Sequence, residues 1–266
     1  MAVNTQETGD DKFRARVRKI SKMGGGTVAY KIRSDGERDQ VQIKAREVDV
    51  PVLYKEFEID RQDFEAYVTK GINLTTEATL LAMEVVASDE ESMLIKGCTP
   101  KGTTDQVDGL YDSAESTIDT TLHLSTTGTA VKAVAKGIRQ MRTKKVKELS
   151  FHWLLNPDEV ETISSNQISG TTVYEIDQVI KALNCGNANG PGGVWGSEEI
   201  PAGAGLMVPY DPSRKYYEIL NPVTPSIELV TDPYHPDLGN VLGTVYETSL
   251  PHIKRPECLY KFTDLA

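Results

Sequence analysis

The residues with catalytic or metal-binding potential do not form a complete motif in this chain. Gly97–Thr103 has the glycine spacing of a phosphate-binding loop, but Thr103 stands where such a loop needs a lysine to reach the β- and γ-phosphates. The segment also follows an expected helix instead of a strand, so a loop that ends this helix is the better interpretation. None of the four histidines pairs with another at i, i+4 or lies beside a cysteine, so the sequence shows no metal motif.

The acidic run Asp89–Glu91 is the other feature that could do chemistry. Two carboxyl groups that act as a catalytic pair must converge in one cleft, whereas consecutive residues of a helix point about 100° apart. A solvated or subunit-facing helix surface is therefore the better interpretation of this run. Neither G-x-S-x-G nor H-E-x-x-H occurs. We expect no catalytic residue, no metal and no cofactor, and the sequence predicts a protein that is not an enzyme.

Two basic clusters stand out because the chain is acidic, with 29 lysines and arginines, 39 aspartates and glutamates, and a net charge of −10. The first cluster comprises Lys12, Arg14, Arg16, Arg18, Lys19 and Lys22. The second comprises Lys132, Lys136, Arg139, Arg142, Lys144, Lys145 and Lys147. Each can be a solvated helix face, or a surface that faces phosphate or the acidic face of another subunit. The overall negative charge argues against a protein whose entire surface binds nucleic acid or an anionic membrane.

Length and composition are those of an ordinary globular protein. The 266 residues allow one large or two small domains, and 39% hydrophobic with 26% charged residues permit a packed core. No apolar run is long enough to span a bilayer, and the polar N-terminus shows no secretory signal. Three cysteines without C-x-x-C spacing do not form a disulfide framework and indicate a reducing compartment.

The first part of the chain predicts an arm followed by a long hairpin. Three apolar residues of the arm have the i, i+4, i+7 spacing of a short helix: Phe13, Val17 and Ile20. A run of three glycines then breaks any helix. Residues 27–33 and 41–59 predict two long strands joined by a turn at 34–37. This hairpin has too few bulky apolar residues to form its own core, so we expect it to lie on another subunit.

The centre of the chain predicts a short helix at 60–70 and a long helix at 74–96. Apolar residues at 78–87 occupy several helix faces, so the long helix is expected to be largely buried. It stops at Gly97 and, at roughly 1.5 Å per residue, is about 35 Å long, which is more than a compact domain of this size needs. We therefore expect it to form a spine.

The second half predicts three more helices, a glycine-rich loop and a series of strands. The helices are expected at 127–142, from Pro157 after a cap at Asn156, and at 174–184. The glycine-rich loop follows at 186–193. The strands are expected at 149–155, 205–209, 216–220, 226–231, 241–249 and 259–262. In the first of them His152 would be half-buried. The fold class is α+β, with strands at both ends of the chain and helices between them.

An ordered set of motifs runs from residue 51 to the C-terminal region. It begins with the strand Pro51–Ile59, a short helix before Lys70-Gly71, and a long helix ending in Glu90–Gly97. Three later motifs are Trp153–Asp158, Tyr246–Thr248 and Arg255–Tyr260. This order of a strand pair, a spine helix ending in an acidic pair, a few apolar residues and a glycine resembles the tailed-virus capsid fold (Hong Kong type). That superfamily includes virus major capsid proteins and encapsulin nanocompartment shells.

The resemblance implies how the chain is divided. It implies an N-terminal arm at 1–26, an extended hairpin loop at 27–59 that overlaps a neighbouring subunit, and a peripheral domain at 60–117 and 233–266 with the spine helix. Residues 118–232 would be the axial domain, whose loops meet around five- or sixfold axes. The candidate residues for the axial pore loop are Gly186, Asn187, Gly190, Gly192 and Gly193. The first basic cluster would face the interior and its DNA.

The function that the resemblance implies is a subunit that self-assembles into an icosahedral shell. The preferred hypothesis is the major capsid protein of a tailed virus or provirus, and an encapsulin shell around a cargo enzyme is the alternative. Encapsulin shells have a longer N-terminal helical segment in their cargo-docking groove, whereas here only Phe13 is aromatic before Tyr30. A third hypothesis, from another class, is a soluble enzyme with scattered catalytic residues.

The expected partners and location follow from these hypotheses. The partners are further copies of the chain, packaged double-stranded DNA bound without sequence specificity, and a cargo protein if the shell is an encapsulin. No membrane is expected. The location is the virion capsid, assembled in the host cytoplasm, or the cytoplasm for an encapsulin.

Overall fold

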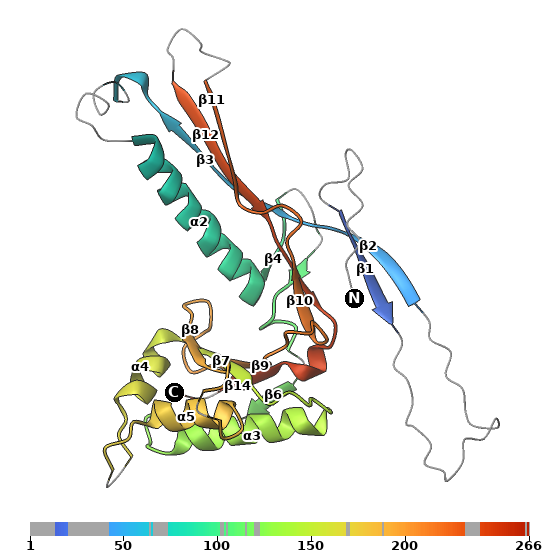
Figure 1. Ribbon diagram of the computed structural model, residues 1–266, viewed down its shortest axis with the longest axis vertical. Helices are drawn as coiled ribbons and strands as arrows, with labels where there is room; N and C mark the ends of the chain where they lie inside the picture. Colours follow the sequence, from blue (N-terminus) through green and yellow to red (C-terminus); the bar gives the residue numbers. More distant parts are fainter. Residues whose placement is uncertain are drawn as a thin grey trace, which may run out of the picture.

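The computed structural model shows two packed bodies and a separate hairpin (Figure 1). The upper body holds a long helix and a three-stranded sheet, and the lower body holds a five-stranded sheet and three helices. The structure describes residues 14–20, 43–63, 65, 74–101, 104, 106–114, 116–119, 123–168, 171–187, 189–231, 240–263 and 265.

The upper body is built on α2 (Leu74–Lys96), which lies along an antiparallel sheet (Figure 1). The sheet has the order β11 (Ser226–Thr231), β12 (Val241–Thr248), β3 (Val52–Ile59). The helix and the sheet bury a small core of Ala82, Val86 and Val245. Phe57 packs against this core and lies across Gly243, its partner in the strand register.

The C-terminal end of α2 is closed by a glycine and by the returning chain. Gly97 has a φ of +85°, the left-handed conformation that ends many helices. The N–H of Tyr111 then donates to the Ile95 carbonyl at 2.8 Å, so this end of the helix is satisfied by backbone. A Cβ on Gly97 would lie 2.6 Å from the Gly109 nitrogen, so two backbones meet closely here. This approach is made by the short strands β4 (Gly97–Cys98) and β5 (Val107–Asp108).

The lower body is a mixed five-stranded sheet covered by helices on one face. The strand order is β6 (Ser116–Asp119), β14 (Tyr260–Thr263), β9 (Gly205–Pro209), β7 (Phe151–Leu155), β8 (Val194–Gly196). The outer pairs β6–β14 and β7–β8 are parallel and the inner pairs are antiparallel. The covering helices are α3 (Thr129–Thr143), α4 (Pro157–Ser165) and α5 (Glu175–Leu183).

The core of the lower body follows the alternation of β7. Phe151, Trp153 and Leu155 are fully buried against the helices, while the residues between them are half-buried. The opposite face of the sheet carries Leu206 and Val208, which pack with Ile95 from the end of α2 and join the two bodies. Beside them lie β10 (Tyr217–Leu220), paired with β13 (Leu250–Ile253), and a 3-10 turn at Pro256–Cys258.

The expected helix in the N-terminal arm is wrong, because β1 (Arg14–Ile20) is a strand paired antiparallel with β2 (Ile43–Asp49). The segment alternates basic and apolar residues as well as matching a helical stripe, and pairing with β2 decides for the period of two. The expected strand at 27–33 and turn at 34–37 lie outside the described residues. Figure 1 shows the β1–β2 hairpin to one side of the two bodies.

Several other expectations are confirmed and two are corrected. The spine helix, the Asn156 cap of α4, and β9 and β11 have the predicted bounds. Residues 61–63 and 65 of the short helix at 60–70 are helical. The α2 helix is not largely buried, however, since Leu80, Leu81 and Val85 are exposed. In addition, the last part of the expected hairpin, β3, pairs with β12 of the upper body.

The two bodies do not follow the expected sequence ranges at two strands. β11 falls in the range expected to be axial, yet it pairs with β12 in the upper body. β14 falls in the range expected to be peripheral, yet it pairs with β9 and β6 in the lower body. Each body is thus completed by a strand from the other range. Among the described residues no helix is both long and apolar enough to cross a membrane.

Candidate functional site: glycine loop, apolar surface and basic face

The glycine loop, residues 185–193, is organised by one buried side chain at the end of α5. Asn184 donates from Nδ2 to the carbonyls of Ile180 and Gly192, both at 2.9 Å. Its Oδ1 accepts the N–H of Gly192 at 2.7 Å. The amide therefore makes a reciprocal pair with the Gly192 backbone, and both ends of the loop are held to the same residue.

The five residues predicted for the pore loop all lie in this one turn: Gly186, Asn187, Gly190, Gly192 and Gly193. Gly186 has a φ of +98° and ends α5. A Cβ on Gly190 or on Gly192 would lie 2.2 or 2.8 Å from the Asn184 Oδ1, so only glycine allows this approach. The Gly193 carbonyl accepts the N–H of Trp153 from β7, which fixes the loop to the sheet.

Sequence reasoning missed Asn184, which organises the loop. Its signal was present: an asparagine directly after a helix and before several glycines is well placed to hydrogen-bond local backbone. The glycines of the loop were predicted from the sequence, but the role of Asn184, whose side chain makes the glycines necessary, was not.

The first basic cluster is partly described. Lys12 and Lys22 lie outside the described residues. Arg14, Arg16, Arg18 and Lys19 are positions of β1. The register places Arg14 opposite Asp49 and Arg16 opposite Glu47. Residues of opposite charge are therefore paired across part of this hairpin, and the cluster is not on a helix.

The upper body exposes large apolar side chains on its helix and its sheet. On α2, Leu80 and Leu81 are 55% and 64% exposed. On the sheet, the exposed side chains are Val52, Tyr54, Ile227, Leu229 and Val230. By the strand register, Ile227 and Leu229 lie on one face of the sheet and Val52, Tyr54 and Val230 on the other. Exposed apolar residues on both faces and on the helix indicate surfaces that other protein covers.

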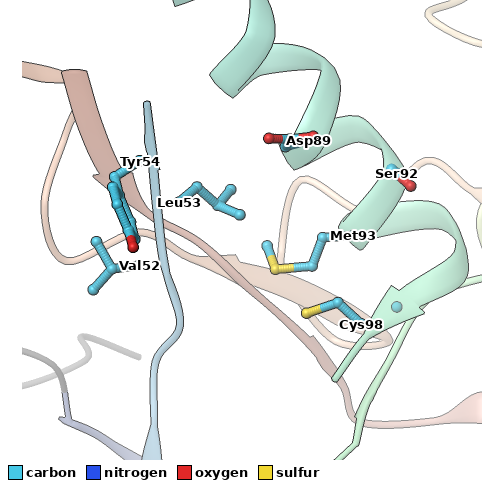
Figure 2. Close-up of a pocket in the computed structure, with 8 residues that line it drawn as sticks. Val52, Leu53, Tyr54, Asp89, Ser92, Met93 and Cys98 are labelled. Carbon is cyan, nitrogen blue, oxygen red and sulfur yellow. The ribbon is translucent and has the colours of Figure 1, made fainter. Parts of the chain in front are cut away.

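A small cavity of about 320 Å³ lies between β3 and the end of α2 (Figure 2). Figure 2 shows Leu53 and Met93 pointing toward each other across it, with Asp89 at its edge. Burial raises the pKa of the Cys98 thiol, which also lines the cavity, so this thiol is a poor nucleophile. In the part of the chain that the structure describes, no three His, Cys, Asp or Glu residues are grouped to hold a metal. The cavity is therefore better suited to hold an apolar side chain than to bind a metal ion or carry out a reaction.

The acidic run of α2 is divided among three surroundings. Asp89 borders the cavity, and Glu91 accepts a hydrogen bond from Ser197 Oγ of the lower body at 2.5 Å. Glu90 faces Glu247 of β12, which is only 4% exposed and whose Oε1 has no hydrogen-bond partner. Burial, and secondarily the Glu90 carboxyl group, raise the pKa of Glu247. The run is structural and its members do not converge in a cleft.

His152 occupies the half-buried position that the sequence predicts. Its Nδ1 accepts the indole N–H of Trp195 at 3.1 Å, and burial lowers its pKa. The ring is therefore neutral near pH 7, with its proton on Nε2. The edge of the Tyr210 ring lies against it, at 5.6 Å between ring centroids. This aromatic group stabilises the rim of the sheet.

The second basic cluster forms one continuous surface, the α3 basic face. It comprises Lys132, Lys136, Arg139, Arg142, Lys144, Lys145 and Lys147, and all seven are exposed. The helix α3 has the predicted position, with Ala133, Val134 and Met141 buried on its other side. α3 and the end of α2 pack on opposite faces of the five-stranded sheet (Figure 1). The face is therefore remote from the exposed apolar residues of the upper body.

Comparison with protein families and sequences gives one match. The model of a family described as "Encapsulating protein for peroxidase" matches residues 21–187. Comparison with the sequences of curated proteins gives no match.

Comparison with solved structures shows the fold. A virus-like particle from Pyrococcus furiosus is similar with a TM-score of 0.63 and 15% identity, over 94% of this chain and 86% of that chain. The capsid of Myoviridae phage XM1 gives a TM-score of 0.69 and 10% identity, over 95% and 86%. The capsid of the native GTA particle gives 0.63 and 11%, over 96% and 86%. The expected tailed-virus capsid fold of the Hong Kong type is thus confirmed.

Proposed function

The chain belongs to the family described as encapsulating protein for peroxidase and is a shell-forming subunit, and from this premise we propose that its shell is the capsid of a tailed virus or provirus enclosing double-stranded DNA. The observation that carries this choice of contents is the strand β1. The resemblance drawn from the sequence assigns cargo docking in encapsulins to an N-terminal helical segment. Residues 14–20 form half of a β-hairpin instead.

The hairpin β1–β2 is the element we assign to contact between neighbouring subunits. Among the described strands, β1 and β2 pair with each other and with no third strand, and the hairpin lies beside the two bodies (Figure 1). A two-stranded hairpin is marginally stable in water by itself, so a surface on another copy of the chain would stabilise it. The exposed apolar residues of α2 and the upper sheet are the surface that would become buried between copies.

We assign the upper body to the peripheral domain and the lower body to the axial domain of the capsid fold. In this assignment β11 and β14 pair outside the expected ranges, 60–117 with 233–266 and 118–232, and β6 spans the boundary between them. In this assignment the glycine loop lies where subunits meet around an axis. The rigid support from Asn184 suits a loop that must have the same conformation in every copy.

A protein-filled compartment is the second candidate, and the description of the matched family favours it. In both candidates the subunit is structural and has no catalytic role, and its main partner is itself. The capsid would be part of a virion assembled in a host cytoplasm, and the compartment would stay in the cytoplasm.

The test is to purify the full-length chain after expression in bacteria and to examine it by electron microscopy. Closed shells of megadalton mass are expected, and a small oligomer would contradict the shell. The contents separate the two candidates. Nuclease-protected nucleic acid that is released when shells are disrupted supports the capsid, whereas a single co-purifying cargo protein without nucleic acid supports the compartment. Turnover of a metabolite by a small oligomer would support an enzyme.

A further inference from the structure

The α3 basic face places seven positive charges on one helix and the turn that follows it. Residues 120–147 include seven lysines and arginines and no aspartate or glutamate. Removing these seven charges from the net −10 leaves −17 for the rest of the chain. The positive charge of this face is therefore local, because the rest of the chain is acidic in sum.

Two carboxylates close to this face are engaged elsewhere. Glu175 of α5 is buried, and its Oε1 accepts the N–H groups of Gly128 and Ala130 at 2.9 and 3.0 Å, which caps the start of α3. Glu148 forms an ion pair with Lys215 at 3.2 Å. Among the residues that the structure describes, no carboxylate forms an ion pair with Lys132 or Arg139. The charges of Lys132 and Arg139 are thus not neutralised by a described carboxylate and can meet a partner.

The geometry of the face is fixed by the fold. Lys132, Lys136 and Arg139 follow the i, i+4, i+7 spacing, so they lie in a row with about 5–6 Å between neighbours. Arg142 extends the row, and its Nη2 donates to the Glu148 carbonyl at 3.0 Å. In the turn after α3, Val146 is buried and anchors the exposed lysines on either side of it. A row of long, flexible cationic side chains can contact several phosphates of one nucleic-acid backbone at once.

The composition of the face distinguishes between two kinds of partner. Five of its seven charged residues are lysines, and one exposed aliphatic side chain, Leu149, lies at its edge. The centres of protein–protein interfaces are depleted in lysine and enriched in aromatic residues, methionine and arginine. Phosphate backbones, in contrast, are bound by scattered lysines and arginines without an apolar anchor. The composition therefore favours phosphate over the acidic face of another subunit.

We propose that the α3 basic face binds the phosphate backbone of double-stranded DNA without reading its sequence. The inference rests on the proposed function in one respect, because it places this face toward the DNA-filled interior of the shell. Binding of this kind releases condensed counterions, so the logarithm of the binding constant falls with the logarithm of salt concentration by about 0.9 per phosphate contact.

The test is a salt titration of DNA binding with the full-length chain. Subunits released from disrupted shells are titrated against a labelled duplex of arbitrary sequence at several KCl concentrations, with fluorescence anisotropy as the readout. The variant Lys132→Gln/Lys136→Gln/Arg139→Gln is expected to lower the slope by about two to three and the affinity at 0.1 M KCl by about tenfold or more. A second duplex of unrelated sequence should give the same result.

The matched control is Lys55→Gln/Lys101→Gln/Arg214→Gln, which removes the same charge from exposed positions elsewhere. It should leave the slope close to that of the parent chain. An unchanged slope in the α3 variant, or an equal loss in the control, would overturn the proposal. So would an α3 variant that binds DNA normally but no longer forms shells, because the face would then contact another subunit. Failure of the parent chain to form shells would refute the proposed function, and the titration would still decide the binding site.

Discussion

At the scale of single residues, Asn184 shows how one side chain can determine a loop. Its amide forms hydrogen bonds with both the N–H and the carbonyl of Gly192, which is buried. We predict that Asn184→Ala leaves the Gly192 N–H without a partner and destabilises the subunit by about 1–3 kcal/mol. Chemical denaturation measures the loss, and hydrogen exchange should show faster exchange at residues 185–193.

The control for this prediction is Asn187→Ala, an exposed residue of the same loop. Its side chain accepts only the N–H of Asn189, so the expected change is within about 0.5 kcal/mol. Equal effects from the two substitutions would show that Asn184 does not organise the loop.

Glu247 predicts a dependence of stability on pH. Its pKa is raised in the folded protein by burial and by Glu90, so the folded state holds the proton more tightly than the unfolded chain. Stability is therefore highest at pH values below the ordinary glutamate pKa and falls as the pH rises through the raised pKa. Glu247→Gln mimics the protonated form and should stabilise the protein at pH 7.5 by on the order of 1 kcal/mol. The difference should shrink toward pH 4.

Melting temperatures at pH 4, 6 and 7.5 measure this effect. The control is Glu84→Gln, an exposed position of α2, the helix that carries Glu90, and it should shift the melting temperature little at any of the three pH values. A Glu247→Gln protein that melts below the parent at pH 7.5 would mean that the charged carboxylate is needed in the folded state.

At the scale of elements, local sequence signals predict the positions of helices better than they predict which strands pair. α2 was placed correctly because apolar crowding and Gly97 are both contained in its own segment. β1 was missed because seven residues fit two periods, and only β2, which comes much later in the sequence, decides between them. β13 was missed because Pro251 interrupts it. The pairing of Glu90 with Glu247 joins distant segments and has no local signal.

The contact between β3 and β12 gives a prediction at this scale. A Cβ on Gly243 would lie 2.1 Å from Cζ of Phe57, so any side chain there must displace the ring. We predict that Gly243→Val costs about 1–3 kcal/mol, because the ring leaves its packing against Ala82 and Val86. Urea denaturation measures the cost.

Two comparisons make this prediction specific. Phe57→Ala combined with Gly243→Val should cost less than the sum of the single changes, because the clash is absent in the double variant. Thr244→Val exchanges one β-branched residue for another at the next position of β12 and should be close to neutral. Additive effects of Phe57→Ala and Gly243→Val would mean that the ring does not lie over the glycine.

At the scale of the whole molecule, the apolar surface of α2 predicts that folding and assembly separate. Leu81 is mostly exposed in the subunit, so Leu81→Glu should change the stability of the unassembled chain by less than about 0.5 kcal/mol. Between subunits the same change buries an unpaired carboxylate, and closed shells should be lost. Sedimentation velocity measures assembly, and Leu81→Met, which stays apolar, should assemble normally.

Removal of the hairpin tests the other contact between copies. The deletion must end at residue 49, because β3 begins at Val52 and belongs to the upper sheet. A chain that lacks residues 14–49 should keep the circular dichroism and cooperative melting of a folded protein but form no closed shells. Normal particles from this deletion would refute the role assigned to the hairpin.

The backbone passes between the two bodies three times, at residues 97–116, 221–225 and near 249. Ser197 and Glu91 add a hydrogen bond across the junction, and Lys96 and Glu199 add an ion pair at 2.7 Å. When tightly packed contents press on a shell from inside, each subunit carries tension across this junction. Three backbone segments share that load in parallel. Contacts between neighbouring subunits should therefore give way before the two bodies of one subunit separate.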